Sequence, residues 1–209
     1  MYQVINPKET SRAAAFELWR HSPMPMVTFL KTLDVSRLLR LSKRSGVQFN
    51  KLMCYCVGRA ANGMDLFYQL PVGDEFQRFD RLCIDVIVNV KSGGIQYCDI
   101  PFDNDFQIFS DSYDRLTREV AETGVYNDMC DSHMCIGTSA LVCYDLDGVI
   151  NAHSGRWNNP FMVWGRYRKR LFRTTLPVSF QFHHAQMDGQ YAAEYLDRLQ
   201  HEIRTLKLG

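Results

Sequence analysis

The sequence predicts an α/β (α+β) two-layer sandwich, in which helices pack on a mixed, largely antiparallel sheet. Segments rich in β-branched and aromatic residues recur along the chain, and segments with apolar residues at helical spacing lie between them. No repeat, low-complexity tract or linker interrupts this order. With 209 residues and 46% apolar content the chain can bury one substantial core, so residues 1–209 are expected to form a single domain.

The predicted helices are identified by their caps and by their apolar spacing. Small hydroxyl or carboxyl side chains precede several of them and can accept hydrogen bonds from the free N–H groups of the first turn. Proline or glycine then ends the helix. The expected helices are one capped by Thr10 or Ser11 and ended by Pro23, one capped by Asp34 or Ser36 and ended by Gly46, and residues 50–61, 110 or 112 to 122, and 191–206.

The predicted strands are short runs rich in valine, isoleucine and aromatic residues, separated by turn residues. Pro71-Val72-Gly73-Asp74 is typical of a hairpin turn between two of them. The runs from 82 to 90 and from 176 to 182 are the most strongly strand-like and are expected in the sheet interior. The expected strands are residues 26–33, 67–70, 75–79, 82–90, 95–100, 138–144, 161–167 and 176–182.

Two histidines and an aspartate, His183, His184 and Asp188, lie in the turn between the last predicted strand and the last predicted helix. Such a corner fixes side chains while leaving their tips accessible. Because the pKa of imidazole lies near neutral pH, a histidine here can take a proton from a hydroxyl or thiol and return it later. Asp188 could orient that histidine or could pin the turn through an ion pair. Two histidines satisfied by backbone hydrogen bonds are the plain structural alternative.

These residues form a known pattern. His183–Gly189 reads His-His-x-x-x-Asp-Gly, which resembles the active-site motif of the chloramphenicol acetyltransferase family and, in looser form, that of dihydrolipoyl acyltransferases. Residues 11–21 resemble that family's Arg-x-x-x-Phe-Glu-x-(aromatic)-Arg-His segment, and residues 159–167 are similar to its Ala-Pro-x-x-Thr-Met-(small)-Lys-Tyr strand. The resemblance covers nearly the whole chain and implies the chloramphenicol acetyltransferase fold.

The resemblance also implies roles for individual residues. His184 is the expected general base, which removes the proton from an acceptor hydroxyl so that its oxygen attacks the thioester of acetyl-CoA, the expected co-substrate. Asp188 is expected to pair with Arg12 and to fix the surroundings of the histidine. Tyr167 and Arg166 are expected to bind the adenine and a phosphate of coenzyme A, for which a ring face and a guanidinium are chemically suited. No cofactor is expected to be bound permanently.

The acceptor pocket and the oligomeric state follow from the same resemblance. Leu18, Trp19 and Val27 occupy the positions of the acceptor pocket, which is expected to be apolar but of a different shape from the mostly aromatic pocket of the family. Trp19 could equally be a core anchor. The family's active site lies between subunits, which implies a homotrimer.

Two positions depart from the family pattern. Counting back from Tyr167 without gaps, the serine that hydrogen-bonds the oxyanion falls at Leu146, which cannot donate. A polar threonine of the family falls at Val163. Loss of one oxyanion donor typically lowers turnover about 10²–10³-fold. Other donors nearby are Thr138, Ser139 and Ser154, and Asn151-Ala152-His153 adds polar groups that the family motif lacks.

The composition excludes several classes of function. A net charge of +1 gives no field that favours nucleic acid or an anionic membrane, so neither is an expected partner. The sequence has no apolar run long enough to span a bilayer, and its first residues do not resemble a signal peptide, so a cytoplasmic location is expected. There is no Gly-x-Ser-x-Gly elbow and no phosphate-binding loop.

Seven cysteines are spread through apolar segments, and their odd number favours reduced thiols over a disulfide framework. Cys130, His133 and Cys135 offer three zinc ligands within six residues, but the sequence nominates no fourth. This stretch is therefore interpreted as a loop without a metal, and a metal site is the less favoured alternative.

Three hypotheses about function remain. The first is an O-acetyltransferase that acts on chloramphenicol or a similar hydroxyl compound and thereby confers antibiotic resistance. The second is an acyltransferase with another acceptor; a dihydrolipoyl thiol is disfavoured because the sequence shows no lipoyl domain and no flexible Ala/Pro linker. The third is a non-catalytic relative that binds an apolar ligand, a hypothesis prompted by Leu146.

Overall fold

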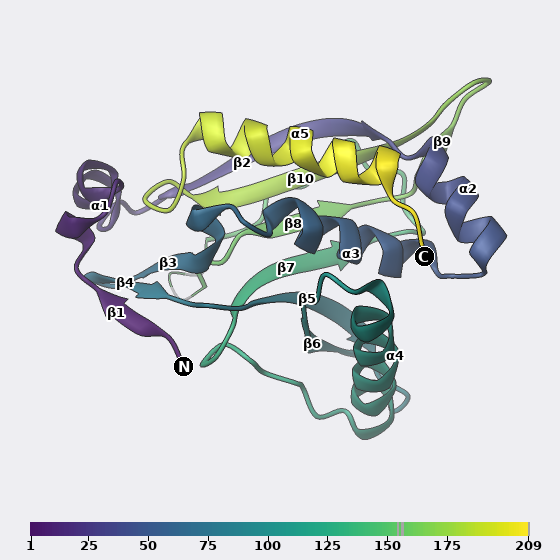
Figure 1. Cartoon of the computed structure of the whole chain (residues 1–209), viewed down its shortest axis with the longest axis horizontal. Coiled ribbons are helices and arrows are strands. Elements are labelled where there is room, and N and C mark those ends of the chain that lie inside the picture. The colour runs from purple at the N-terminus through teal and green to yellow at the C-terminus, as the bar shows by residue number, and fades with distance from the viewer. Residues whose placement is uncertain (154, 156, 209) are drawn as a thin grey trace.

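Helices cover one face of a mixed sheet in the computed structural model, which describes residues 1–153, 155 and 157–208 (Figure 1). The helices are α1 (Ala13–Trp19), α2 (Ser36–Ser45), α3 (Phe49–Ala61), α4 (Phe106–Thr123) and α5 (Gly189–Thr205), with 3₁₀ turns at Pro7–Glu9 and Asp65–Tyr68. The strands are β1 (Gln3–Ile5), β2 (Met26–Asp34), β3 (Gln69–Val72), β4 (Glu75–Arg78), β5 (Leu82–Asn89), β6 (Ile95–Pro101), β7 (Met134–Ala140), β8 (Phe161–Trp164), β9 (Arg168–Lys169) and β10 (Thr174–His183).

The main sheet has seven strands in the order β2-β10-β8-β7-β5-β6, with β9 paired to the start of β10. Strand β10 is antiparallel to both β2 and β8, whereas β7 is parallel to β8 and to β5. A smaller sheet, in the order β1-β4-β3, lies beside it. The predicted mixed sheet with helices packed on it is therefore confirmed.

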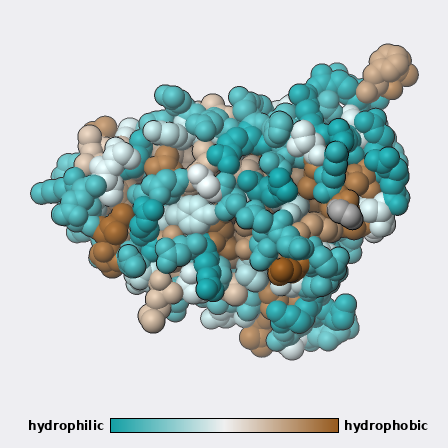
Figure 2. All heavy atoms as spheres, viewed as in Figure 1, coloured by the Kyte–Doolittle hydropathy of each residue, from teal (hydrophilic) through white to brown (hydrophobic). Residues whose placement is uncertain are grey.

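One face of β10 packs against the helices. Phe180 and Phe182 are fully buried, and the ring centroid of Phe180 lies 4.7 Å from that of Tyr195 in α5. Tyr195 in turn contacts Phe67, 4.6 Å away between centroids. Burial of such rings supplies much of the hydrophobic stabilisation of a core. The outer faces of the helices are mostly hydrophilic, as Figure 2 shows. The helices are therefore the outermost layer on this side of the sheet.

The opposite face of β10 carries polar residues at alternate positions, namely Ser179, Gln181 and His183, and all three are buried. The segment between β7 and β8 crosses over them. The N–H of Val149 donates to Ser179 Oγ at 2.7 Å, and Gln181 Nε2 donates to the carbonyl of Asn151 at 2.9 Å. Because each of these buried groups has a partner, the crossing segment is held firmly on the strand.

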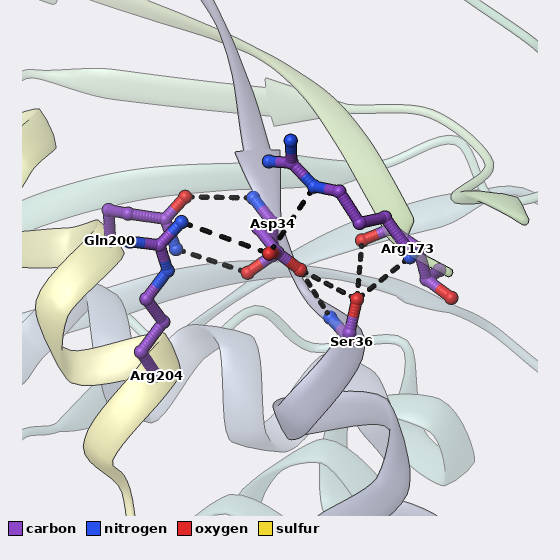
Figure 3. A network of polar contacts seen from close by, with 6 residues as sticks. Asp34, Ser36, Arg173, Gln200 and Arg204 are labelled. Carbon is purple, nitrogen blue, oxygen red and sulfur yellow. Dashed lines mark hydrogen bonds and ion pairs between the residues drawn. The ribbon is translucent and has the colours of Figure 1, made fainter. Parts of the chain in front are cut away.

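At the other end of the β2–β10 pair, Asp34 links β2 to α2, to α5 and to Arg173, just before β10 (Figure 3). Asp34 Oδ1 accepts hydrogen bonds from the backbone N–H of Ser36 at 3.1 Å and from its hydroxyl at 2.6 Å. Arg173 and Arg204 reach Oδ2 at 3.5 and 3.8 Å, and Gln200 bonds to the Asp34 backbone at both N–H and carbonyl. Burial raises the pKa of Asp34, but the Ser36 hydrogen bonds and the two arginines outweigh it and lower the pKa overall.

Several predicted element boundaries are wrong. Strand β7 covers Met134–Ala140 rather than residues 138–144, and the chain turns at Leu141–Tyr144. Helix α4 begins at Phe106 because Asp105 caps it by accepting hydrogen bonds from two N–H groups of the first turn. Residues 65–68 form a 3₁₀ turn instead of the start of a strand. Arg12, rather than Thr10 or Ser11, is the N-cap of α1.

The expectation that all cysteines are reduced is also wrong, because Cys83 and Cys135 form a disulfide. These residues lie directly opposite each other in the parallel pairing of β5 with β7, which brings their sulfur atoms together. The other five cysteines are free. Within the described residues, none of the helices combines the length and the apolar character needed to span a lipid bilayer.

Candidate active site

His184 lies in the turn between β10 and α5 and is half-buried. Its backbone N–H donates to the carbonyl of Pro25 at 2.8 Å, which fixes the start of the turn to the chain before β2. The indole of Trp19, at the end of α1, stacks on the His184 ring, with centroids 4.6 Å apart and planes inclined by 6°. Trp19 therefore sets the plane of the imidazole.

Arg12 hydrogen-bonds to the backbone of the same turn. Its Nη2 donates to the carbonyl of His184 at 2.9 Å, its Nε to that of Ala185 at 3.2 Å, and its Nη1 pairs with Asp188 Oδ2 at 2.9 Å. The planar fork of a guanidinium suits three acceptors placed in this way. Asp188 also caps α5 by accepting a hydrogen bond from the N–H of Gln190. Of the two roles open to Asp188, the ion pair with Arg12 is the one that forms.

The Arg12–Asp188 pair is not fully buried, since the Arg12 side chain is 8% exposed and that of Asp188 is 40% exposed. Solvent screens the charge of Asp188. The pair should therefore contribute less to the free energy of unfolding than a fully buried ion pair would. The bonds from Arg12 to the two carbonyls are the more protected part of the arrangement.

The two histidines of the motif differ in what their rings bind. His183 Nδ1 accepts a hydrogen bond from the N–H of Ala185 at 3.0 Å. Burial, together with the neighbouring His153 and His184, lowers the pKa of His183 to about 4, so its ring is neutral at neutral pH. In contrast, His184 Nδ1 is buried with no hydrogen-bond partner among the described residues. The His183 ring therefore stabilises the turn through this hydrogen bond, whereas Nδ1 of the His184 ring makes none among the described residues.

His153 was singled out in the sequence only as an additional polar group. It lies near enough to His183 to affect its pKa, and its Nδ1 is buried without a partner among the described residues. The segment that crosses β10 thus brings a third imidazole to this corner. A crossing of this kind cannot be read from residue spacing, because it depends on the path of the loop.

The residues expected in the acceptor pocket have different surroundings. Trp19 contacts His184 directly, as described. Leu18 is 70% exposed. Val27 pairs with Phe182 across β2 and β10 and packs against the main hydrophobic core.

Tyr167 and Arg166 lie at the opposite end of β10. With Phe49, Asn50, Val142, Gly165 and Lys169 they line a groove of about 600 Å³. The Tyr167 ring contacts that of Phe49 edge-on, with centroids 5.7 Å apart, and Arg166 donates to the carbonyl of Cys143. A hairpin that projects from the body (Figure 1) separates β9 from β10, and its tip residues Leu171 and Phe172 are 88% and 89% exposed.

Within one chain, His184 and the groove lined by Tyr167 and Arg166 lie far apart. Thr175 pairs with Arg168, so Tyr167 lies beside Leu176, eight residues before His184 along β10. At the rise of a β-strand this separation is about 25 Å.

Leu146 and Val163 also lie away from His184. A Cβ atom at Gly165 would lie 3.2 Å from Leu146 Cβ, which places Leu146 against the strand end near Tyr167. Arg168 holds this turn through Asp145 at 2.6 Å and Asp147 at 2.8 Å. Val163 pairs with Ser179 and is buried.

The alternative oxyanion donors named from the sequence differ in availability. Thr138 Oγ1 donates to the carbonyl of Asp85 at 2.8 Å and is buried, so its hydroxyl is already committed. Ser139 lies on β7 opposite Val163. Ser154 lies outside the described residues.

Solved structures define the class to which this fold belongs. A chloramphenicol acetyltransferase matches with a TM-score of 0.83 and 19% identity, covering 97% of this chain and 100% of its own. A probable dihydrolipoamide acetyltransferase from Listeria monocytogenes matches with a TM-score of 0.72 and 11% identity, covering 96% and 92%. At such identities the likeness shows the shared fold, which both acetyltransferases have.

Sequence comparison gives the family. Residues 1–200 match the profile of the chloramphenicol acetyltransferase family, and the chain belongs to that family. Chloramphenicol acetyltransferase 3 of Escherichia coli is 24% identical over 211 residues, which cover 99% of each chain. Chloramphenicol acetyltransferase 2 of Escherichia coli is 23% identical over 194 residues, or 91% of each. Membership of this family supports acyltransferase activity.

Proposed function

We propose that this protein is an O-acetyltransferase that moves the acetyl group of acetyl-CoA to a hydroxyl of chloramphenicol or a similar small molecule, with His184 as the general base. The observation that carries the proposal is the contrast within the motif. His183 is bound into the fold, whereas the His184 ring is held in plane by Trp19. His184 Nδ1 is buried, so Nε2, which makes no hydrogen bond among the described residues, is the nitrogen left to face an acceptor. A general base needs both a fixed ring and an uncommitted nitrogen.

The proposed reaction is a direct transfer. His184 takes the proton of the acceptor hydroxyl as its oxygen attacks the thioester carbonyl, which forms a tetrahedral intermediate with a negative oxygen. The carbon–sulfur bond then breaks, the carbonyl re-forms as the ester, and the protonated His184 returns the proton to the departing sulfur. No covalent bond to the protein is needed.

The separation of about 25 Å along β10 supports an active site made by two copies of the chain. In this proposal His184 of one copy faces the groove of the next, where Tyr167 and Arg166 hold coenzyme A. The exposed Leu18 and the stacked Trp19 contribute to the wall around the acceptor, with Val27 behind them. A homotrimer is the assembly that the family resemblance favours, and a ring of heterologous contacts closes in this way.

Leu146 favours keeping a second candidate. Because its side chain cannot donate a hydrogen bond, the oxyanion lacks one stabilising group that the family supplies. An acyltransferase with a different acceptor, or a relative that binds an apolar ligand without chemistry, would fit that loss.

The test is release of the coenzyme A thiol from acetyl-CoA with chloramphenicol as acceptor. We expect turnover by the wild type, loss of at least about 10²-fold in kcat for His184→Ala, and an increase for Leu146→Ser. His201→Ala, which removes an exposed histidine of α5, is the matched control and should leave turnover unchanged. Turnover that survives in His184→Ala would exclude the proposed base.

If wild type and Leu146→Ser release no thiol with chloramphenicol, the acceptor is wrong and other hydroxyl compounds or thiols are to be tried. A thermal shift on adding chloramphenicol without any thiol release would support the binding protein instead.

A further inference from the structure

A second group of reactive side chains lies on β5, β6 and β7. Cys83, Asp99 and Cys135 are buried, and their ligand atoms lie within 4.8 Å of one another. Asp99, Asp128 and Cys130 form an adjoining group within the same distance. The two groups share Asp99, so together they offer three sulfur atoms and two carboxylates. The proposed acetyl transfer uses none of these residues.

The sheet itself builds the first group. Cys83 and Cys135 are paired residues of the parallel strands β5 and β7, and their Cα atoms are 4.6 Å apart. Asp99 comes from β6, on the other side of β5, and its Oδ2 lies 3.3 Å from Cys135 Sγ. Around a tetrahedral zinc ion with ordinary bond lengths, a sulfur and an oxygen ligand are about 3.6 Å apart. The pair is therefore already near the spacing that zinc requires.

The segment after α4 brings the second group to the same place. Asn127 lies along β6, where its side chain donates to the carbonyl of Asp99 at 2.6 Å. The N–H of Met129 donates to Asp99 Oδ2 at 2.8 Å, and that of Cys130 to Asp128 Oδ1 at 2.8 Å. These bonds fix the carboxylate and the loop relative to each other before any ion binds, as hydrogen bonds to the ligand side chains do in metal sites.

Charge supplies an independent argument. Asp99 is 5% exposed, and within the described residues no lysine or arginine forms an ion pair with it or with Asp128. A buried carboxylate is costly unless a cation or a metal compensates it. Thiolate ligands beside it select a thiophilic ion over magnesium or calcium.

We propose that Cys83, Cys135 and Asp99 form a zinc site when Cys83 and Cys135 are reduced, and that the disulfide between the two cysteines is the metal-free state of the same site. A phosphine reductant and water convert the disulfide to two thiols and the phosphine oxide. Each thiol then loses its proton on binding Zn²⁺. Oxidation by a small disulfide reverses this, because the two thiolates give up two electrons and release the ion.

This site differs from the cluster that the sequence suggests. His133 Nδ1 lies 2.8 Å from Ser132 Oγ, and His133 belongs to neither group of converging ligand atoms. Its place is taken by Cys83 and Asp99, which are distant in sequence. His133→Ala is therefore a control that separates the two possible sites.

The experiment measures zinc in the full chain after incubation with Zn²⁺ and removal of free metal. We expect about one zinc per chain in protein reduced with a phosphine and none in the oxidised protein. Competition with a chromophoric chelator should show an affinity loss of more than about 100-fold for Cys83→Ser and for Asp99→Asn. Loss of a ligand should exceed the roughly 10–100-fold effect of losing a side chain that only hydrogen-bonds to a ligand. His133→Ala and Cys143→Ser, which changes an exposed cysteine, should bind like the wild type.

Alkylation of the wild-type protein gives a second measurement that does not depend on whether the variants fold. Because Cys83 and Cys135 are 0% and 4% exposed, the reduced chain is alkylated in dilute urea, over a time long enough for transient opening. Zinc should slow the reaction of both cysteines with iodoacetamide while leaving that of Cys143 unchanged, as mass spectrometry of the peptides would show. Zinc binding that is equal in reduced and oxidised protein, or that is lost in His133→Ala and kept in Cys83→Ser, would overturn the proposal. So would alkylation of Cys83 and Cys135 at the same rate with and without zinc.

Discussion

The two ends of the β2–β10 strand pair are both fixed by arginine–carboxylate contacts, but they satisfy their polar groups differently. At one end Asp34 accepts from Ser36, faces Arg173 and Arg204, and has its backbone bonded by Gln200 (Figure 3). At the other end Arg12 is bonded to two carbonyls and to Asp188, yet the neighbouring His184 keeps a buried nitrogen without a partner among the described residues.

The difference separates groups that stabilise the fold from a group that is available for chemistry. A buried polar atom without a partner costs about 1–3 kcal/mol, so most such atoms in a folded protein find one. At the Asp34 end this rule is obeyed. At the His184 end, His184 Nδ1, His153 Nδ1 and Gln186 Oε1 are all buried without partners among the described residues. Arg12 and Trp19 nevertheless hold this corner in place, and a fixed corner with unpaired polar atoms is the arrangement that we expect around a reacting group.

The largest expected effect, on activity, tests whether His184 of one copy works with the Tyr167–Arg166 groove of another. His184→Ala and the double variant Arg166→Ala, Tyr167→Ala should each lose activity alone. Refolded together in equal amounts, they should recover about a quarter of wild-type activity, because half of the histidine ends and half of the grooves are intact and they meet at random in a ring. The measurement is thiol release from acetyl-CoA.

Two controls bracket that result. Each variant refolded alone must stay inactive, and a mixture of His184→Ala with wild type must recover no more than the wild-type share of sites. If the two inactive variants give no activity when mixed although both assemble, the active site does not lie between copies.

The next effect concerns the support of the His184 corner. Arg12→Met removes three hydrogen bonds and leaves the carbonyls of His184 and Ala185 without their donor. We expect the free energy of unfolding to fall by about 2–3 kcal/mol and kcat to fall with little change in KM for the acceptor, because the turn that carries the base is released. Urea unfolding and steady-state kinetics measure the two quantities.

Arg20→Met provides the comparison for Arg12→Met. Arg20 pairs with Glu17 and Asp74, whose side chains are 66% and 72% exposed, so its loss should cost at most about 1 kcal/mol. Arg12→Lys should rescue little, since an ammonium cannot bond three acceptors in the guanidinium plane. Full activity in Arg12→Lys would show that only the charge matters.

A third effect is the dependence of stability on pH at the histidine end. The pKa of His183 in the folded protein is about 4, below its ordinary value of 6.5. Between these values the unfolded chain binds more protons than the folded one, so stability falls as the pH is lowered from about 6.5 towards 4. His183→Asn removes the titrating ring, and its urea unfolding free energy should change less between pH 7 and pH 4.5 than that of the wild type. An equal change in both proteins would contradict the buried neutral ring.

Much of the fold and part of the corner could be predicted from the sequence because they rest on local patterns. Apolar periodicity locates β10 and α5, and the spacing of the family motif leads to the Arg12–Asp188 contact. The boundaries of β7 and α4 were missed for local reasons. The strand includes Met134 and Cys135, which also fit a metal-binding loop, and Asp105 caps the helix before the serines do.

Other features depend on pairings between distant parts of the chain. The Cys83–Cys135 bond follows from the parallel register of β5 and β7 across 52 residues, which composition alone cannot reveal. The stacking of Trp19 on His184 depends on where α1 docks. The separation of Tyr167 from His184 follows from the length and direction of β10, and it appears only when the strand pairing is known.

The smallest expected effect belongs to the well-satisfied end. Asp34→Asn keeps an acceptor for Ser36 but removes the charge opposite Arg173 and Arg204, whose side chains are 60% and 56% exposed. Because such exposed pairs are weak, we expect a loss of about 1 kcal/mol in unfolding free energy, or about 3 °C in Tm, with no change in kcat.

This loss should itself depend on pH. The pKa of Asp34 in the folded protein is lowered from 3.8, so the carboxylate stabilises the fold above that value and loses this contribution as the pH falls through its folded pKa. The margin of the wild type over Asp34→Asn should therefore shrink below about pH 4. Asp197→Asn, which changes a carboxylate that is 75% exposed and pairs with Lys31, is the control and should have the smaller effect at neutral pH. A fall in kcat for Asp34→Asn as large as that for Arg12→Met would show that the two ends of β10 are not separate in function.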